Sequence, residues 1–462
     1  MWFLTVIVGS HDECIDTESK AHAPDPAGDS LRPALRLAGA IPFLPTTHAT
    51  AAPFCHEATR MTTSTAEAFA QDRQPRFLHA VTLILFLAAA SVPTPLYRLY
   101  QREWGFSPLM LTVIFAVYAL ALLAALLIFG SLSDRAGRRP VILAALTLEG
   151  VALVLFLTAR GIEWLVFARL IQGFATGLAT TSLGAAMLDI DRQGGALTNA
   201  LATIAGTAFG AVGSGLLAQY APAPLHLGYV LLFALVVVQA IRTAHAPETI
   251  TTRSLQRWSF KPRVAVPARA RVAFLAMTPI NVALWALSGF YLALMPSLLV
   301  TITDPAAAWL GGLAVAALMA GAAAAILVLR RYSASSALIL GAGALVAGLL
   351  GVLAGANVAS PSLLLASSAL AGIGFGAAYL GALGSIAPLA EPHERGALMA
   401  AFYIEGYLSH ALPAVGAGYL AQEIGLLAAA NVFGAALILL ACAATFLALA
   451  QRRDLSRRKR SA

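Results

Sequence analysis

Residues 130–142 read GSLSDRAGRRPVI, a short charged turn between two long apolar runs. Apolar residues occupy nearly all of 109–129 before the turn and of 140–157 after it. A helix needs about 20 residues to cross the hydrocarbon core of a bilayer, which is about 30 Å thick. Each run is long enough, so the turn, with Asp134 and three arginines, is expected at a membrane face. The sequence therefore predicts a helical hairpin through a membrane.

The composition of the whole chain supports a membrane protein. Of its 462 residues, 59% are hydrophobic and only 11% are charged, whereas soluble proteins carry about 25% charged residues. The net charge of +8 does not indicate nucleic-acid binding, because nearly all Lys and Arg residues outside the apolar runs are predicted to lie on one side of the membrane. Cys14, Cys55 and Cys442 have neither a zinc-site spacing nor the pattern of a disulfide framework.

Apolar runs of spanning length recur along the chain. We expect twelve spans, at 77–98, 109–130, 140–159, 162–188, 196–219, 225–243, 272–300, 306–329, 335–355, 361–389, 397–420 and 424–450. An even number places both termini on one side. On that side lie nearly all Lys and Arg residues outside the spans, and the other side keeps only Arg98, Arg102 and Arg160. Cytoplasmic loops are enriched in Lys and Arg, so both termini are predicted to be cytoplasmic.

The spans divide into two related sets of six. The longest hydrophilic connection among them is 244–271, between spans six and seven. Residues 211–219 (AVGSGLLAQ) in span five match residues 414–422 (AVGAGYLAQ) in span eleven. We therefore expect a six-helix bundle at 76–243, a cytoplasmic linker at 244–271, a second bundle at 272–450 and a basic tail at 451–462. Residues 1–75 are expected to be a disordered extension, with Met61 as an alternative start.

Three motifs resemble those of the major facilitator superfamily. The Gly-x-x-x-Asp-Arg-x-Gly-Arg-Arg spacing of 130–139 is similar to the family's loop between its second and third helices. Arg169-x-x-Gln172-Gly173 is similar to its fourth-helix motif. The glycine-rich run 206–215 is similar to the fifth-helix motif of drug/proton antiporters, but Ala211 stands where that motif has proline.

The resemblance implies an all-α polytopic membrane protein with twelve transmembrane helices in two pseudo-symmetric six-helix bundles. It implies a central cavity that opens alternately to each side, a small-molecule substrate, a proton as coupling ion and a lipid bilayer as surroundings. It also implies a monomer in the plasma (inner) membrane, with no metal and no organic cofactor.

The turn at 130–139 is expected to act as a conformational latch. Asp134 and Arg138 are four residues apart and can pair if the turn is helical. In the family, the equivalent aspartate contacts the start of span eleven, here Gly396. The alternative is that the arginines only keep the turn on the cytoplasmic side. The latch residues are Gly130, Asp134, Arg135, Gly137, Arg138 and Arg139.

Span four carries polar side chains into the membrane. At 100° per residue, Arg169, Gln172 and Thr176 lie on one helix face. A charge at this depth requires a partner or a watery cavity, and the resemblance associates Arg169 with proton coupling. Helical rise places Glu149 of span three at nearly the same depth, so an ion pair between Glu149 and Arg169 is expected, and Glu149 is a proton-coupling candidate with Arg169. The alternative is an arginine with a purely structural role.

Span eleven is also unusually polar. Tyr403, Tyr407 and His410 share one face, whereas Glu405 lies nearly opposite. Glu405 and His410 are proton-coupling candidates, because carboxyl and imidazole groups can bind and release a proton. The alternative is a hydrogen-bonded pair at the interface between the bundles.

The remaining candidates are substrate contacts and packing positions. Substrate-cavity candidates are Gln172, Thr176, Asn281, Trp285, Tyr379, Tyr403 and Tyr407, several of them favoured by the resemblance. Gly206, Gly210, Gly213 and Gly215 are expected to let helices pack closely. Pro93 and Pro95 should interrupt the hydrogen bonds of span one. Residues 247–249 are expected to be a helix stop.

The sequence lacks three common enzyme and ATPase motifs. It contains no His-Glu-x-x-His, no Gly-x-Ser-x-Gly and no Gly-x4-Gly-Lys-Ser/Thr. We therefore expect a transporter rather than an enzyme, with proton-coupled efflux of a drug or metabolite as its activity. Proton-coupled uptake of a metabolite is the alternative within this class, and a non-transporting membrane sensor is the alternative outside it.

Overall fold

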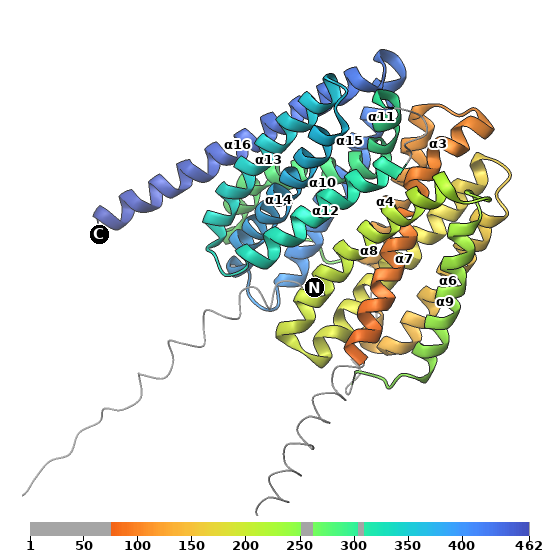
Figure 1. The fold of residues 1–462 in the computed structure, drawn as a ribbon. Coiled ribbons are helices and arrows are strands. Elements are labelled where there is room, and N and C mark those ends of the chain that lie inside the picture. Colours follow the sequence, from red (N-terminus) through yellow and green to blue (C-terminus); the bar gives the residue numbers. More distant parts are fainter. Residues whose placement is uncertain (1–74, 251–261, 304–308, 462) are drawn as a thin grey trace, which may run out of the picture. The chain divides into compact units, whose positions relative to one another are not determined.

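The computed structural model describes residues 75–250, 262–303 and 309–461, which form helices joined by short connections (Figure 1). No strand occurs in these three ranges. The expected extension, with Met61, and part of the linker lie outside the described residues, apart from Pro75.

The first half of the described chain, residues 75–245, begins with a broken helix. Residues 75–91 are helical, Val92 is a turn, and α3 (Pro93–Trp104) continues the span. The break occurs at the prolines, as expected from the sequence. The half continues with α4 (Pro108–Phe129), the single turn α5 (Ser133–Ala136), α6 (Arg138–Leu157), α7 (Ile162–Ile190), α8 (Arg192–Tyr220) and α9 (Leu227–His245).

The second half, residues 268–461, has a similar succession of helices. A short η1 (Ala268–Ala270) leads into α10 (Arg271–Ala293), and α11 (Met295–Ile302) continues that span after a break at Leu294. The remaining elements are α12 (Trp309–Leu329), α13 (Ala334–Asn357), α14 (Pro361–Ile386), η2 (Ala387–Leu389), α15 (Arg395–Ile424) and α16 (Leu426–Ser461).

Eleven helices of the described residues are long and apolar enough to cross a membrane. Of the twelve expected spans, the one that is not among them is α15, which is 30 residues long. It carries Glu405, Ser409 and His410 between its apolar residues. The polar residues that make α15 a candidate for function thus also make it less apolar than the other spans.

Several helices begin at a serine that caps them. The Ser107 hydroxyl accepts a hydrogen bond from the Met110 N–H at 3.2 Å, and Pro108 follows it at the first helical position. Ser360 and Pro361 repeat this arrangement at the start of α14. A side-chain oxygen at this position satisfies an N–H that the helix leaves unpaired, and proline there loses no bond. These local signals fix where α4 and α14 begin.

The connections separate into two sides. We call the side with 131–137, 246–250, 262–270, 330–333 and 387–394 the basic side, and the other the opposite side. Ion pairs join elements at the basic side: Arg76 pairs with Asp191, and Arg269 pairs with Glu391 at 2.6 Å and with Glu394.

The two halves contact each other through small residues. Helix α4 packs along α15, and α8 packs along α12. A Cβ atom at Gly418 would lie 2.1 Å from the Thr112 Oγ1, and one at Gly312 would lie 2.1 Å from the Ala211 carbonyl oxygen. These four residues lie toward the opposite side.

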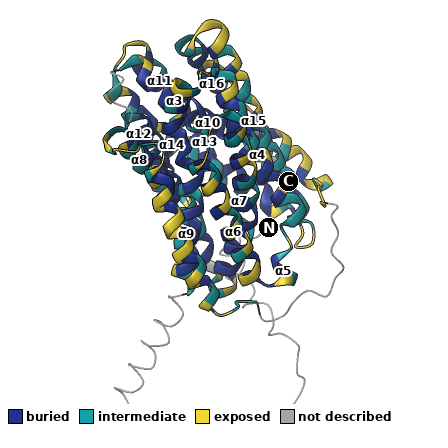
Figure 2. Ribbon diagram, turned by 90° about the vertical axis from the view of Figure 1, so that its right-hand side faces the viewer, coloured by how far each residue is buried: buried dark blue, intermediate teal, exposed yellow. Residues whose placement is uncertain are grey.

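Two polar contacts also cross between the halves near the opposite side. The Arg98 guanidinium donates to the Thr301 hydroxyl at 3.3 Å, which joins α3 to α11. The Trp309 N–H donates to the Gln219 side-chain oxygen at 3.4 Å. The outward surfaces of the helices carry many exposed residues, as on α9 (Figure 2), where Leu235 and Ile241 are more than half exposed.

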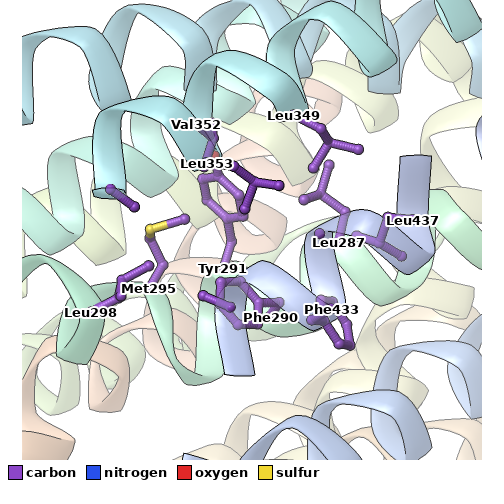
Figure 3. Close-up of a pocket in the computed structure, with 13 residues that line it drawn as sticks. Leu287, Phe290, Tyr291, Met295, Leu298, Leu349, Val352, Leu353, Phe433 and Leu437 are labelled. Atoms are coloured by element: carbon purple, nitrogen blue, oxygen red, sulfur yellow. The ribbon is translucent and has the colours of Figure 1, made fainter. Parts of the chain in front are cut away.

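A small cavity of about 20 Å³ lies within the second half, where α10, α11, α13 and α16 meet (Figure 3). Leu287, Phe290, Leu349 and Phe433 are among the side chains that line it. A cavity of this size holds about one water, but an apolar one remains dry. We interpret it as a packing gap rather than a binding site.

Candidate functional site

The turn at 130–139 is held together by Arg138. This side chain is 3% exposed and pairs with Asp134 at 2.5 Å and with Asp189 of α7 at 3.0 Å. It also donates to the Ser133 hydroxyl at 2.8 Å. Gly137 connects α5 to α6 with φ +102, a left-handed conformation that a side chain would strain. Arg138 therefore ties the turn to the end of α7.

A second carboxylate, from residues 247–249, also binds this turn. Glu248 accepts hydrogen bonds from the Arg138 N–H at 2.9 Å and the Arg139 N–H at 3.2 Å. These N–H groups lie at the start of α6, where the helix dipole favours negative charge. The sequence predicted only a helix stop here, so it missed the role of Glu248. An acidic residue directly after a basic-side span was the available signal.

The predicted latch contact is not made in this structure. The recorded ion pair of Asp134 is to Arg138 in the same turn, rather than to the start of α15. Gly130 ends α4 in the right-handed helical region. Arg135 lies in α5, and Arg139 is exposed at the start of α6.

A buried polar network lies in the middle of the first half. Glu149 of α6 and Gln172 of α7 are fully buried, and Arg169 is 1% exposed. The Gln172 Nε2 donates to the Glu149 Oε1 at 2.9 Å, and the Arg169 Nη1 donates to the Gln172 Oε1 at 2.8 Å. Glu149 and Arg169 are thus joined through Gln172, and the direct ion pair expected from the sequence is not formed.

The network also holds the broken first span. The Arg169 Nη1 donates to the Ala90 carbonyl oxygen at 2.9 Å, and the Gln172 Nε2 donates to the Ala89 carbonyl oxygen at 3.2 Å. The guanidinium carbon of Arg169 lies 4.2 Å from the ring centre of Tyr118, a cation–π contact. These partners explain why the guanidinium lies between Gln172 and the first span instead of against Glu149.

Two atoms of this network have no hydrogen-bond partner. They are the Oε2 of Glu149 and the Nε of Arg169. An unpaired buried polar atom is costly and usually has a functional explanation. Thr176 lies one turn further along α7, fully buried, and its hydroxyl donates to the Gln172 backbone oxygen at 2.8 Å.

In the second half, aromatic side chains gather between α10 and α15. The Trp285 ring centre lies 4.7 Å from that of Tyr407, 6.5 Å from that of Tyr403 and 5.9 Å from that of His410. The His410 Nδ1 lies 3.1 Å from the Trp285 backbone oxygen. The Phe115 ring, from the first half, lies 5.0 Å from the His410 ring. Aromatic residues of both halves therefore meet at this point.

One further candidate from the sequence lies close by. Tyr379 of α14 has its ring 6.1 Å from that of Phe402. The Trp285 indole nitrogen is buried without a partner. Trp285, Tyr403 and Tyr407 are partly buried.

Glu405 of α15 has a hydrogen-bond partner in α10. Its carboxylate accepts a hydrogen bond from the Asn281 Nδ2 at 2.7 Å, and Asn281 is fully buried. Seven residues make two helical turns, so Glu405 shares a face of α15 with Leu412 and Tyr419. These two residues are 58% and 52% exposed. The structure thus brings Glu405 and Asn281 together, one turn of α10 before Trp285.

The four glycines of α8 have different surroundings. A Cβ at Gly206 would lie 2.5 Å from the Ile84 carbonyl oxygen, and one at Gly210 would lie 2.2 Å from that of Ala88. Gly215 faces Trp309 of the other half, and nothing lies within 4 Å of a Cβ at Gly213.

Within the described ranges, no group of three or more His, Cys, Asp or Glu side chains is placed to hold a metal ion.

Comparisons with known proteins agree with this architecture. The model of the Major Facilitator Superfamily matches residues 80–412. The crystal structure of the human organic anion transporter MFSD10 (TETRAN) is similar, with a TM-score of 0.56 and 17% identity over 81% of this chain and 99% of that one. A variant of the nucleoside transporter NupG has a TM-score of 0.65 and 14% identity, over 80% and 98% of the two chains. A comparison with curated protein sequences gave no match.

Proposed function

The chain belongs to the Major Facilitator Superfamily, whose model matches most of it, and we propose that it couples the export of a small organic molecule to the entry of protons. Membership and fold make it a multi-pass secondary transporter rather than an enzyme. The direction of transport, the proton and the kind of substrate are the proposal. The observation that carries it is the buried network of Glu149, Gln172 and Arg169.

This network suits a proton site because two opposite charges depend on each other. Ionised Glu149 balances Arg169 through Gln172 in a region of low dielectric. When the carboxylate binds a proton, the positive charge of Arg169 keeps only carbonyl and aromatic partners. The two protonation states therefore stabilise different arrangements of α6, α7 and the first span. Glu405, with Asn281, is a second candidate for the same role.

The substrate is proposed to bind where the aromatic residues of the two halves meet. Trp285, Tyr403 and Tyr407 are partly exposed there and offer flat apolar surfaces. Such walls favour a substrate with an aromatic or apolar body over a sugar or a phosphate ester. Export is favoured over uptake because the motifs of α7 and α8 resemble those of drug exporters.

We assign the basic side to the cytoplasm of a plasma (inner) membrane, following the distribution of Lys and Arg. The close contacts between the halves lie toward the opposite side, at Gly312 and Gly418. This supports a state that is closed to the outside. In the alternate state, the turn at Asp134 would approach Gly396 at the start of α15 and act as the latch.

The proposal is tested by accumulation of fluorescent compounds in efflux-deficient cells that express wild type, Glu149→Gln, Arg169→Ala or Glu405→Gln. Wild type should lower accumulation of at least one compound, and a protonophore should abolish this. Glu149→Gln and Arg169→Ala should behave as the empty vector at equal expression. The exposed carboxylate variant Glu423→Gln serves as the matched control and should export normally.

The same experiment separates the rival functions. Proton-driven uptake would appear as increased accumulation that the protonophore abolishes. A non-transporting sensor would change the accumulation of no compound in either direction. Export that survives Glu149→Gln would leave the transporter in place but remove Glu149 as its proton site.

A further inference from the structure

The break in the first span leaves a backbone oxygen without its usual partner. In an α-helix the N–H of residue i donates to the carbonyl oxygen of residue i−4. Proline has no N–H, so Pro93 cannot donate to the Ala89 oxygen. Val92 keeps helical backbone angles, and its N–H donates to the Ala88 oxygen at 3.0 Å, so the span continues into α3 with the bond of Pro93 missing. A buried carbonyl oxygen without a donor is unfavourable, and here a side chain of another helix supplies the missing bond.

That side chain is Gln172. Its Nε2 lies 3.2 Å from the Ala89 oxygen and 2.9 Å from the Glu149 Oε1, so both of its N–H groups have acceptors. Its Oε1 accepts from Arg169, which can only donate. The carbonyl of Ala89 can only accept. The amide therefore has one allowed orientation, with its N–H groups toward Glu149 whatever the protonation state of the carboxyl group.

We propose that Pro93 is a positioning residue for the proton site: by leaving the Ala89 oxygen unpaired, it fixes the Gln172 amide as a donor to the Glu149 Oε1. A proton that binds Glu149 then adds to the Oε2, the oxygen without a partner, and leaves from it. The inference rests on the proposed function, because it takes Glu149 as the group that binds the proton.

The surroundings of the carboxylate contain few other groups that could fix its proton. Arg169 of α7 acts on Glu149 electrostatically, and Glu149 acts in the same way on Tyr118 of α4. Arg169 also acts electrostatically on Tyr97 of α3 and His410 of α15. Helix α9 contributes Phe233 and Val236 beside Gly150, next to Glu149, and neither can titrate. The hydrogen bonds recorded for the carboxylate end at its Oε1, so the Gln172 amide decides which oxygen is free.

The test is an infrared pH titration of the purified full-length protein, which needs no substrate. The carboxylic-acid band that Glu149→Gln removes reports protonation of Glu149. Pro93→Ala restores an N–H that competes with Gln172 for the Ala89 oxygen, so the amide loses one of the two groups that orient it and keeps only Arg169. We expect the midpoint of the band to move to higher pH by about one unit, a tenfold change in proton affinity, because a donor to the ionised form is weakened.

Pro95→Ala is the matched control. It restores a donor for the Ser91 oxygen, whereas the recorded bonds of Gln172 and Arg169 to the first span go to Ala89 and Ala90. Its titration should be that of wild type. Gln172→Leu, which keeps Pro93, should shift the midpoint in the same direction. Adding Pro93→Ala to Gln172→Leu should produce no further shift, because the proline acts through the amide.

The outcomes are distinguishable. A band that titrates as in wild type in Pro93→Ala or in Gln172→Leu, or an equal shift in Pro95→Ala, would overturn the positioning role and leave Glu149 as a proton site. If Glu149→Gln removes no titrating band, the proposed proton site itself is wrong, and the inference fails with it.

Discussion

Replacing Gly210 by alanine should force the first span and α8 apart. A Cβ at this position would lie 2.2 Å from the Ala88 carbonyl oxygen and 2.6 Å from the Ala88 Cα, both backbone atoms that cannot rotate away. An ordinary contact begins at 3.4 Å, so the helices must separate by about 1.2 Å, the difference between the two distances. Overpacking of this kind costs about 1–3 kcal/mol.

Gly213→Ala provides the reference for this effect. Both glycines lie within α8, and alanine favours a helix over glycine by up to about 1 kcal/mol in either place. Nothing lies within 4 Å of a Cβ at Gly213, so that variant gains helix propensity without a clash. The difference between the two variants therefore isolates the close approach of the helices.

The measurement is thermal unfolding of both purified variants in the same detergent. Gly213→Ala should match or exceed the Tm of wild type, and Gly210→Ala should unfold at a clearly lower temperature than Gly213→Ala. Equal Tm values for the two variants would show that α8 does not lie as close to residues 84–88 as the structure places it.

Two further predictions concern carboxylates on the basic side. Glu248→Ala removes the acceptor for two N–H groups at the start of α6 and should lower the free energy of unfolding by about 1–2 kcal/mol. Its control, Glu423→Ala, lies at an exposed position and should change that free energy by less than about 0.5 kcal/mol in the same unfolding assay. The backbone N–H of Glu391 and the Arg269 guanidinium hold the pKa of Glu394 below its usual range. Their contribution is present above the unfolded-state pKa of about 4.3 and is lost as the pH falls through the folded-state pKa, so Glu394→Gln should lower Tm more at pH 7 than at about pH 3. An equal decrease at both pH values would contradict this.

The sequence predicted the parts of the fold that depend on local pattern. Long apolar runs become helices, and the turn at 130–139 pairs Asp134 with Arg138 because their spacing of four residues places them on one helical face. Helical rise alone placed Glu149 and Arg169 at similar depths. These features require only neighbouring residues in the chain, so they are visible without a structure.

Contacts between distant segments could not be predicted in the same way. Glu248 binds the start of α6 across 110 residues, and nothing in its own neighbourhood specifies that partner. Gln172 lies between Glu149 and Arg169 because the Ala89 oxygen competes with Glu149 for the Gln172 amide, and the Ala90 oxygen competes with Glu149 for Arg169. That competition depends on how the first span breaks against α7, which is a matter of tertiary packing.

The seam between the two halves has a consequence for the speed of the transporter. At Gly312 and Gly418 the halves meet through backbone and small side chains, and the hydrogen bonds that cross nearby, from Arg98 and from the Trp309 N–H, involve no carboxylate. Surfaces of this kind can slide or part without exposing a buried ion pair, so the activation barrier between the two states contains no large desolvation term. We therefore expect turnover to be limited by release of the bound molecule or of the proton, and to depend only weakly on ionic strength.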